Sequence, residues 1–150
     1  MIAVKIYVEK GARLPEKATP SSACYDVRAF LPFDKEIILE PGDWFAVPTG
    51  LYFEIPEGYF ISVRPRSGLA NKYGITLLNS PGTIDADYRG EFKVILINLG
   101  KDTYIVRHND RIAQILIEKE IPFEWKEVSS RSQLDPSLRN EGGFGSTGLA

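Results

Sequence analysis

Two aspartates lie two positions apart in GTIDADYRG, residues 82–90 of the chain. Residues i and i+2 of an extended strand point to the same face, so Asp85 and Asp87 would crowd two negative charges on one side of a sheet. This arrangement is mildly unfavourable unless a function requires the carboxylates. The glycines at both ends of the stretch let the backbone bend tightly. The stretch is therefore the first candidate for a site whose chemistry needs a carboxylate.

The stretch PRSG, residues 65–68, has the residue types of a phosphate-binding turn. It joins a predicted strand to the only predicted helix, within SGLANKYG, where Ser67 would cap the helix and Gly74 would end it. A helix start presents unpaired backbone N–H groups, while Arg66 adds a planar fork of donors and Ser67 a hydroxyl. A serine cap beside an ordinary surface arginine explains the same residues equally well.

The residues from 129 onward have few core positions and are rich in glycine. A disordered tail is one interpretation of this composition. However, Arg139, Phe144, Ser146 and Thr147 supply a cation, an aromatic ring and two hydroxyls, which are the parts of a lid over a charged, ring-bearing ligand. GGFGSTG also suggests a phosphate cradle, although no GxxxxGK[ST] pattern of a P-loop occurs.

Four further polar residues each have two interpretations. Asp26 is either a strand carboxylate that faces solvent or one that holds the hydration shell of Mg²⁺. Asn79 is either a turn residue or an amide that reads the edge of a base. Gln114 lies in an otherwise apolar strand, where its amide needs a partner. The lone histidine, His108, precedes turn residues and is interpreted as surface decoration without a catalytic role.

Short runs of β-branched and aromatic residues recur between turns rich in Gly, Pro, Asn and Asp, which predicts an all-β sandwich or jelly roll. FKVILINL is apolar at nearly every position, so both of its faces are expected to be buried. We expect one domain over residues 1–128 and a flexible glycine-rich tail over 129–150. The predicted strand runs are IAVKIYV, YDVRAF, EIILE, WFAV, LYFEI, YFISV, ITLLN, EFKVILINL, TYIV, RIAQILIEK and FEWKEV.

Composition excludes several classes of function. The 18 Lys+Arg against 20 Asp+Glu give a net charge of -2, without the basic excess of a nucleic-acid or membrane-surface binder. The single cysteine, Cys24, excludes an intramolecular disulfide, and one Cys and one His cannot build a structural zinc site. No run is long and apolar enough to span a membrane, and the N-terminus lacks a signal-peptide pattern, so we expect a cytoplasmic protein.

Five motifs together resemble the homotrimeric dUTP pyrophosphatase (dUTPase) family. They occur in the family's order and extend over nearly the whole chain, and the third and fifth are highly specific. The motifs are SACYDV at 22–27, PRSGLA at 65–70, NSPGTIDADYRGE at 79–91, RIAQILI at 111–117 and RNEGGFGSTG at 139–148.

The resemblance implies a jelly-roll subunit, three of which share three active sites built from more than one chain. It implies hydrolysis of dUTP to dUMP and pyrophosphate with Mg²⁺, which limits uracil incorporation into DNA and supplies dUMP for dTMP synthesis. Asp85 would activate the attacking water, Tyr88 would pack under the deoxyribose and exclude a 2′-OH, and Asp26 would organise water around the metal. The implied substrate-binding residues are Arg66, Ser67, Gly68, Asn79, Gly82, Thr83, Ile84, Tyr88, Lys93, Gln114, Arg139, Phe144, Gly145, Ser146 and Thr147.

Within that resemblance, Asn79 and the hairpin backbone bind uracil, while Arg66, Ser67 and Gln114 hold the phosphate chain. The tail residues close on the γ-phosphate, with the ring of Phe144 on the base. Asp87 is interpreted as support for the turn or for Arg89.

Three positions depart from the family pattern. Cys24, Asn109 and Asn140 replace residues that are glycine in the family, and Asn tolerates left-handed backbone conformations. Two alternatives remain open: a dCTP deaminase on the related fold, and a catalytically silent trimer that serves as a binding module.

Overall fold

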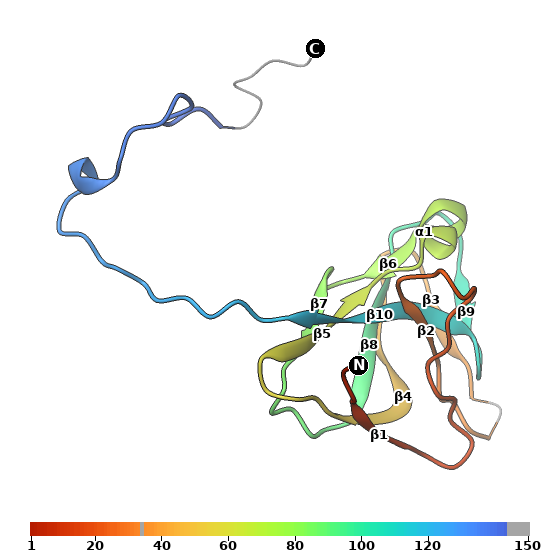
Figure 1. The fold of residues 1–150 in the computed structure, drawn as a ribbon. Coiled ribbons are helices and arrows are strands. Elements are labelled where there is room, and N and C mark those ends of the chain that lie inside the picture. Colours follow the sequence, from red (N-terminus) through yellow and green to blue (C-terminus); the bar gives the residue numbers. More distant parts are fainter. Residues whose placement is uncertain (34, 144–150) are drawn as a thin grey trace.

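The computed structural model describes residues 1–33 and 35–143 (Figure 1). Short strands dominate these residues, with one α-helix and one 3-10 helix. The elements are β1 (Lys5–Val8), β2 (Tyr25–Arg28), β3 (Ile37–Leu39), β4 (Trp44–Glu54), β5 (Tyr59–Arg64), α1 (Ser67–Tyr73), β6 (Ile75–Leu77), β7 (Gly82–Ile84), β8 (Phe92–Asn98), β9 (Tyr104–Val106), β10 (Arg111–Lys119) and η1 (Arg131–Gln133).

Two four-stranded antiparallel sheets form the body of the protein. One has the strand order β1-β4-β8-β6 and the other the order β2-β10-β5-β7, while β3 and β9 form a small third sheet. Strands that are distant in sequence pair within each sheet, so every sheet depends on long-range contacts. The predicted all-β, jelly-roll-like sandwich with one short helix is confirmed.

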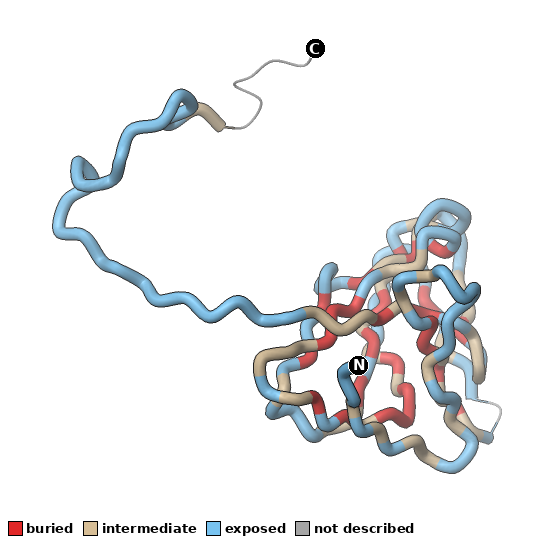
Figure 2. The backbone as a smooth tube through the Cα atoms, viewed as in Figure 1, coloured by how far each residue is buried: buried red, intermediate tan, exposed pale blue. Residues whose placement is uncertain are grey.

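The core lies between the two larger sheets, where the period-2 alternation of the strands places apolar residues inward. Val47 and Leu96 come from the first sheet, and Val27 and Ala113 from the second, and each is at most 1% exposed. Figure 2 shows this buried interior in red within the sheets. This packing fixes the positions of the strand ends, and the candidate site residues project from those ends.

The prediction that both faces of FKVILINL are buried is wrong for the single chain. In β8, Phe92, Val94 and Leu96 are buried, while Lys93 is exposed and the other apolar residues of its face are only half-buried. This half-buried face, with Ile95 and Ile97, is opposite to the face that Phe92, Val94 and Leu96 turn to the core. The outer side of the first sheet therefore carries apolar surface.

Two element predictions need smaller corrections. WFAV and LYFEI form one strand, β4, because the chain continues through an irregular step between Pro48 and Leu51 instead of turning. The α1 cap position is Arg66, not Ser67, and no side chain makes a capping hydrogen bond there. The predicted end is right: Gly74 has a φ of 70°, a left-handed conformation that glycine adopts readily.

The C-terminal segment, residues 120–143, extends away from the sheets (Figure 1). The predicted strand FEWKEV is absent from it, because these residues are exposed and find no partner strand in the described chain. The last strand ends at Lys119, before the predicted domain boundary at residue 128. No helix of the described residues is long and apolar enough to cross a membrane.

Candidate active site

A cavity of about 380 Å³ opens beside the edge strand β7. This volume is in the range of small-molecule sites. Its wall contains seven of the predicted site residues: Asn79, Gly82, Thr83, Ile84, Asp85, Tyr88 and Lys93. The structure therefore brings the predicted site residues of the third motif and Lys93 together around one hollow.

The pairing of β7 with β5 decides which residues face outward at this cavity. Ile84 lies opposite Ile61 and is buried, so the next residue, Asp85, is exposed where the strand ends. The backbone of Gly82 packs closely on its neighbours: a Cβ added there would lie 3.2 Å from Cβ of Val63 and 3.4 Å from the Asn79 amide nitrogen. The amide of Asn79 therefore lies close to the strand that leads to Asp85.

The turn that follows Asp85 is closed by its own residues. The Tyr88 amide donates to the Asp85 carbonyl at 3.2 Å, and Arg89 donates to the carbonyls of Ala86 at 2.6 Å and Tyr88 at 3.1 Å. No ion pair joins Arg89 to Asp87 within the described part of the chain, so the suggested support of Arg89 by Asp87 is not formed. Arg89 itself braces the turn.

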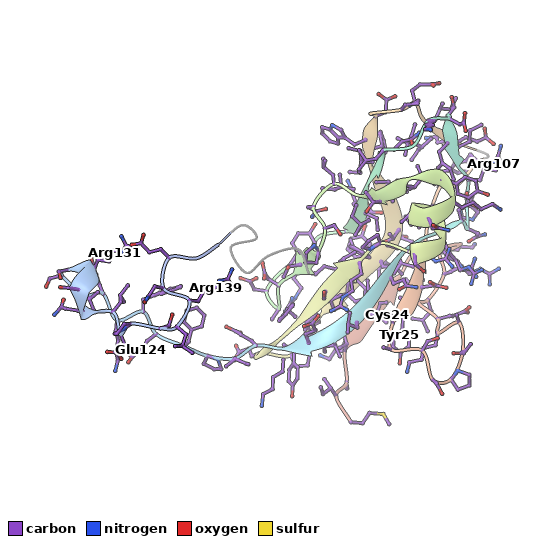
Figure 3. All side chains as sticks on the ribbon, turned by 90° about the horizontal axis from the view of Figure 1, so that it is seen from above. Cys24, Tyr25, Arg107, Glu124, Arg131 and Arg139 are labelled. Carbon is purple, nitrogen blue, oxygen red and sulfur yellow. The ribbon has the colours of Figure 1, made fainter. Side chains whose placement is uncertain are left out.

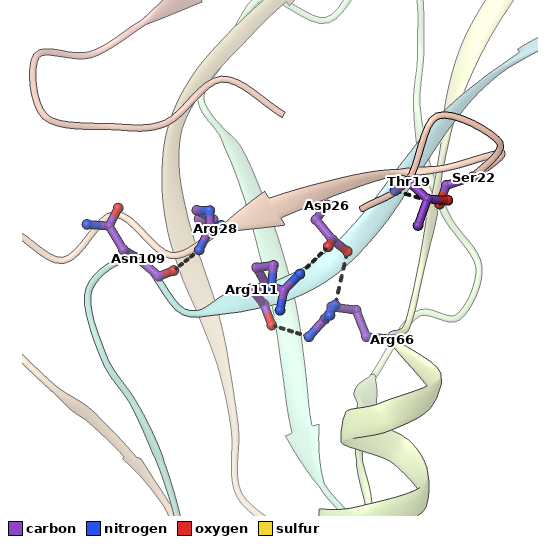
Figure 4. A network of polar contacts seen from close by, with 7 residues as sticks. All are labelled: Thr19, Ser22, Asp26, Arg28, Arg66, Asn109 and Arg111. Atoms are coloured by element: carbon purple, nitrogen blue, oxygen red, sulfur yellow. Dashed lines mark hydrogen bonds and ion pairs between the residues drawn. The ribbon is translucent and has the colours of Figure 1, made fainter. Parts of the chain in front are cut away.

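Two arginines contact the predicted site residue Asp26 at its carboxylate, namely the predicted Arg66 and also Arg111 (Figure 4). Asp26 is 6% exposed, and it accepts a hydrogen bond from Arg66 Nε at 3.0 Å and another from Arg111 Nη1 at 3.2 Å. Arg66 also donates to the Arg111 carbonyl at 3.3 Å. Two arginines and one carboxylate leave a net positive charge at the surface beside the start of α1.

Gln114 lies next to this network. In β10 it is opposite Asp26 of β2 on one side and Arg64 of β5 on the other. Ser67 and Gly68 begin α1 directly after Arg66 and are exposed. We call Asp26, Arg66 and Arg111, together with the neighbouring Ser67, Gly68 and Gln114, the arginine network.

The cavity and the arginine network are separate features of the single chain. None of the residues that form the network lines the cavity. Arg139 lies on the C-terminal segment, apart from the sheets (Figure 3), where its Nε donates to the Gly142 carbonyl at 2.5 Å. The predicted residues Phe144, Gly145, Ser146 and Thr147 lie outside the described residues.

Burial and charge raise the pKa of two tyrosines near these features. Burial is the main cause for Tyr52, and the charge of Glu91 raises its pKa further. Burial also raises the pKa of Tyr104, with the Asp110 charge acting in the same direction and the Arg66 charge opposing it. Both hydroxyls therefore stay protonated at neutral pH and add no negative charge.

No group of three or more His, Cys, Asp or Glu side chains that could hold a metal ion occurs among the described residues. The carboxylate closest to such a role is Asp26, whose two oxygens each accept a bond from an arginine. A carboxylate has about four acceptor positions, so Asp26 can still accept a hydrogen bond from water. This free acceptor capacity is compatible with the predicted contact of Asp26 to a metal ion through water.

The sequence analysis missed three residues that shape the site. Arg111 pairs with Asp26, Arg89 braces the turn, and Glu91 lines the cavity and accepts a hydrogen bond from the Gly50 amide at 3.1 Å. One signal was available: a buried strand carboxylate needs a cation. The sequence could not say which of its arginines supplies it.

His108 and two of the three departures from the family pattern have clear local roles. His108 is not surface decoration: it is half-buried, and its Nδ1 accepts a hydrogen bond from the Leu31 amide at 3.0 Å. Asn109 and Asn140 have φ angles of 68° and 43°, so both take the left-handed conformation expected of glycine substitutes. Cys24 is a free, half-buried thiol.

Comparison with known proteins gives the family. A sequence profile of the dUTPase family matches residues 10–148. The deoxyuridine 5'-triphosphate nucleotidohydrolase of Brucella melitensis biotype 2 is 48% identical over 147 residues, which cover 98% of this chain and 92% of that protein. The enzyme of the same name from Fusobacterium nucleatum is 49% identical over 147 residues, 98% of this chain and 97% of that protein.

Solved structures agree with the sequence relatives. The dUTPase of Staphylococcus bacteriophage 80alpha with dUpNHpp has a TM-score of 0.80 and 27% identity, over 98% of this chain and 99% of that one. On the profile match, the relatives and the shared fold, the chain belongs to the dUTPase family.

Proposed function

We propose that the chain hydrolyses dUTP to dUMP and pyrophosphate, with Asp85 as the general base. The main support is the cavity in which Asn79, Asp85 and Tyr88 meet, in a chain whose relatives are named dUTP nucleotidohydrolases. Asn79 presents an amide that can both donate to and accept from the uracil edge. Tyr88 forms the wall beside the deoxyribose, where a ribose 2′-OH finds no room.

In the chemical step, the Asp85 carboxylate takes a proton from a water molecule while the oxygen of that water attacks the α-phosphorus. The bond between the α-phosphorus and the bridging oxygen breaks, and pyrophosphate leaves with the electron pair. Attack on phosphorus needs little covalent chemistry from the protein, so positioning and charge neutralisation dominate. General-base assistance contributes about 10²–10⁴-fold to such a step.

The arginine network supplies the cationic side of the proposed site. The Arg66 guanidinium can pair with phosphate oxygens, and the Ser67 hydroxyl and Gln114 amide add neutral donors. Asp26 holds Arg66 in place through its 3.0 Å bond. Because Arg111 shares the same carboxylate, the network keeps a net positive charge toward an incoming triphosphate.

We propose that the triphosphate brings Mg²⁺ with it, and that Asp26 acts on the ion through water. Bound Mg²⁺ would neutralise charge on the phosphate oxygens, and it typically retains several waters as ligands. Asp26, Ser67 and Gln114 are the side chains that could accept from or donate to those waters.

We further propose a homotrimer in which one chain's cavity meets another chain's arginine network. Within a single chain the two groups are separate, although one triphosphate nucleotide has to contact both. Exposed apolar residues also favour association: Ile121, Phe123 and Trp125 alternate along the C-terminal segment and are 80%, 73% and 88% exposed. Packing against another subunit would bury them. The roughly 22 residues after 128 can extend about 70 Å. We propose that this tail reaches a neighbouring subunit and closes over the active site there.

In the cell, this reaction would remove dUTP before it enters DNA and would supply dUMP for dTMP synthesis. A panel of dUTP, UTP, dTTP and dCTP, with and without Mg²⁺, tests the assignment directly. Of the four nucleotides, we expect only dUTP to release pyrophosphate, and we expect this release to depend strongly on Mg²⁺. Ammonia released from dCTP would replace this assignment with a deaminase.

Complementation tests the shared site. Asp85→Asn removes the base from the cavity, and Arg66→Ala removes a cation from the network, so each variant alone should be nearly inactive. If each site takes the two residues from different chains, random mixed trimers should have both in about a quarter of their sites. Recovery of activity on co-expression supports the shared site, whereas no recovery would mean that both groups of each site come from one chain.

A further inference from the structure

We propose that Gly90 and Glu91 are specificity-determining positioning residues that hold the Tyr88 ring in place against the sugar. This inference rests on the proposed function, in which Tyr88 excludes a ribose. It concerns what makes that wall rigid. A wall excludes a hydroxyl only to the extent that moving the wall aside costs free energy.

The side chain of Tyr88 is only partly packed, so burial does little to restrict its rotamer. Its residue is 48% exposed and lies on the turn between β7 and β8. Exposed side chains exchange rotamers within nanoseconds unless something restrains them. Without a restraint, the ring could swing away from a 2′-OH, and the selectivity against ribonucleotides would be small.

Gly90 provides a surface on which the ring rests. A Cβ at this position would lie 2.6 Å from Cζ of Tyr88 and closer still to its Oη, a separation that real Cβ atoms do not reach. Gly90 is not among the glycines with a positive φ, so its backbone does not demand glycine. The outer end of the Tyr88 ring occupies the place of this Cβ, so a side chain at position 90 would displace the ring and not the backbone.

Glu91 fastens the edge of the ring to the body of the protein. The Tyr88 hydroxyl donates to the Glu91 carbonyl at 3.0 Å. The Glu91 carboxylate in turn accepts from the Gly50 amide at 3.1 Å and lies 3.9 Å from Lys93 Nζ. The hydroxyl is thus linked through Glu91 to β4 and β8, the central strands of the first sheet.

These contacts fix the ring at two points. Gly90 leaves room for the outer end of the ring, and the Glu91 carbonyl accepts a hydrogen bond from its hydroxyl. An alanine at position 90 would push the ring out of this place. The displaced ring would leave the place that a 2′-OH would take, so we expect the discrimination between dUTP and UTP to fall.

The test compares dUTP with UTP, because the ratio of their kcat/KM values reports the wall and not overall folding. Gly90→Ala should lower this ratio by at least about 10-fold. Tyr88→Phe, which loses only the bond to the Glu91 carbonyl, should lower it about 2–10-fold. Glu91→Ala should lower the ratio, and Glu91→Gln, whose amide oxygen can still accept from Gly50, should restore most of it.

A double-variant cycle shows whether Gly90 acts through the ring. In a Tyr88→Ala background there is no ring to displace, so adding Gly90→Ala should change the ratio no further. Asp87→Asn, on the same turn, is the matched control and should leave the ratio as in the wild type. If Gly90→Ala slows dUTP and UTP equally, Gly90 serves only the fold of the turn and the inference is wrong.

Binding provides a readout that does not depend on turnover. Calorimetry with dUpNHpp and with UpNHpp gives the same sugar preference as a ratio of dissociation constants. If the wild type binds dUpNHpp poorly and leaves dUTP intact, the proposed function itself fails. If the wild type is active and selective but Gly90→Ala, Tyr88→Phe and Glu91→Ala all keep its ratio, only the present inference fails.

Discussion

Replacing Asp26 by Asn tests whether the arginine network is held together by its one buried carboxylate. The substitution keeps the shape of the side chain but removes the negative charge. Its new amide group would also direct N–H donors toward the guanidinium donors of Arg66 or Arg111. Both ion pairs, at 3.0 and 3.2 Å, are lost together.

The expected cost follows from the exposure of the three side chains. Removing one partner of a buried ion pair typically costs 3–5 kcal/mol, because the other charge is left without compensation. Arg111 is 44% exposed and can turn to water, whereas Arg66 is 22% exposed and stays partly desolvated. We therefore expect a loss of about 2–3 kcal/mol, which for a chain of this length corresponds to a Tm lower by about 4–12 °C.

A matched control is available at the surface. Lys5 and Glu54 form an ion pair of 2.8 Å whose side chains are 80% and 51% exposed. The hydrogen bond from Lys5, and then its charge, lower the pKa of Glu54, so this pair contributes above the ordinary carboxyl pKa and is lost on acidification. At neutral pH, solvent screens it, and Glu54→Gln should cause no resolvable change in Tm.

Thermal unfolding followed by circular dichroism at pH 7 measures both variants. Chain concentrations must be equal, because the stability of an oligomer depends on concentration. If Asp26→Asn unfolds within error of Glu54→Gln, burial does not strengthen the network and the reasoning from exposure is refuted. A large loss of stability with unchanged dUTP turnover would instead separate the network's structural role from its proposed role in catalysis.

Three further predictions concern catalysis, the C-terminal segment and pH. Asp85→Asn should lower turnover about 10²–10⁴-fold while dUpNHpp still binds, as rapid-quench and calorimetric measurements would show; near-normal turnover would remove Asp85 as the base. A chain that ends at Val128 should fold and assemble normally, because it keeps every buried core residue, yet its dUTP hydrolysis should fall; full activity would exclude a lid. Burial and the charge of Glu91 raise the pKa of Tyr52, so the stability that its neutral hydroxyl contributes is complete below about pH 10 and falls as the pH rises further. Tyr52→Phe should therefore reduce the loss of unfolding free energy at alkaline pH, measured by urea unfolding.

Local patterns predicted most of the strands, because alternation and turn residues act over a few positions. They predicted poorly where the outcome depends on distant partners. FEWKEV has the composition of a strand, but no other strand of the described chain lies beside it. His108 looked like a surface residue because its partner, the Leu31 amide, is 77 positions away.

The sequence by itself determined the fold class and the chemical types in the site, since β periodicity, turn residues and the five motifs are all written locally. Only the tertiary structure decided how these residues are grouped. It joined Asp26 to Arg66 and Arg111 across 40 and 85 positions, and it kept this network apart from the cavity. It also laid the Tyr88 ring on Gly90. The physical reason is that ion pairing and close packing depend on distances of a few ångströms in space, and strand pairing sets those distances without regard to separation along the chain.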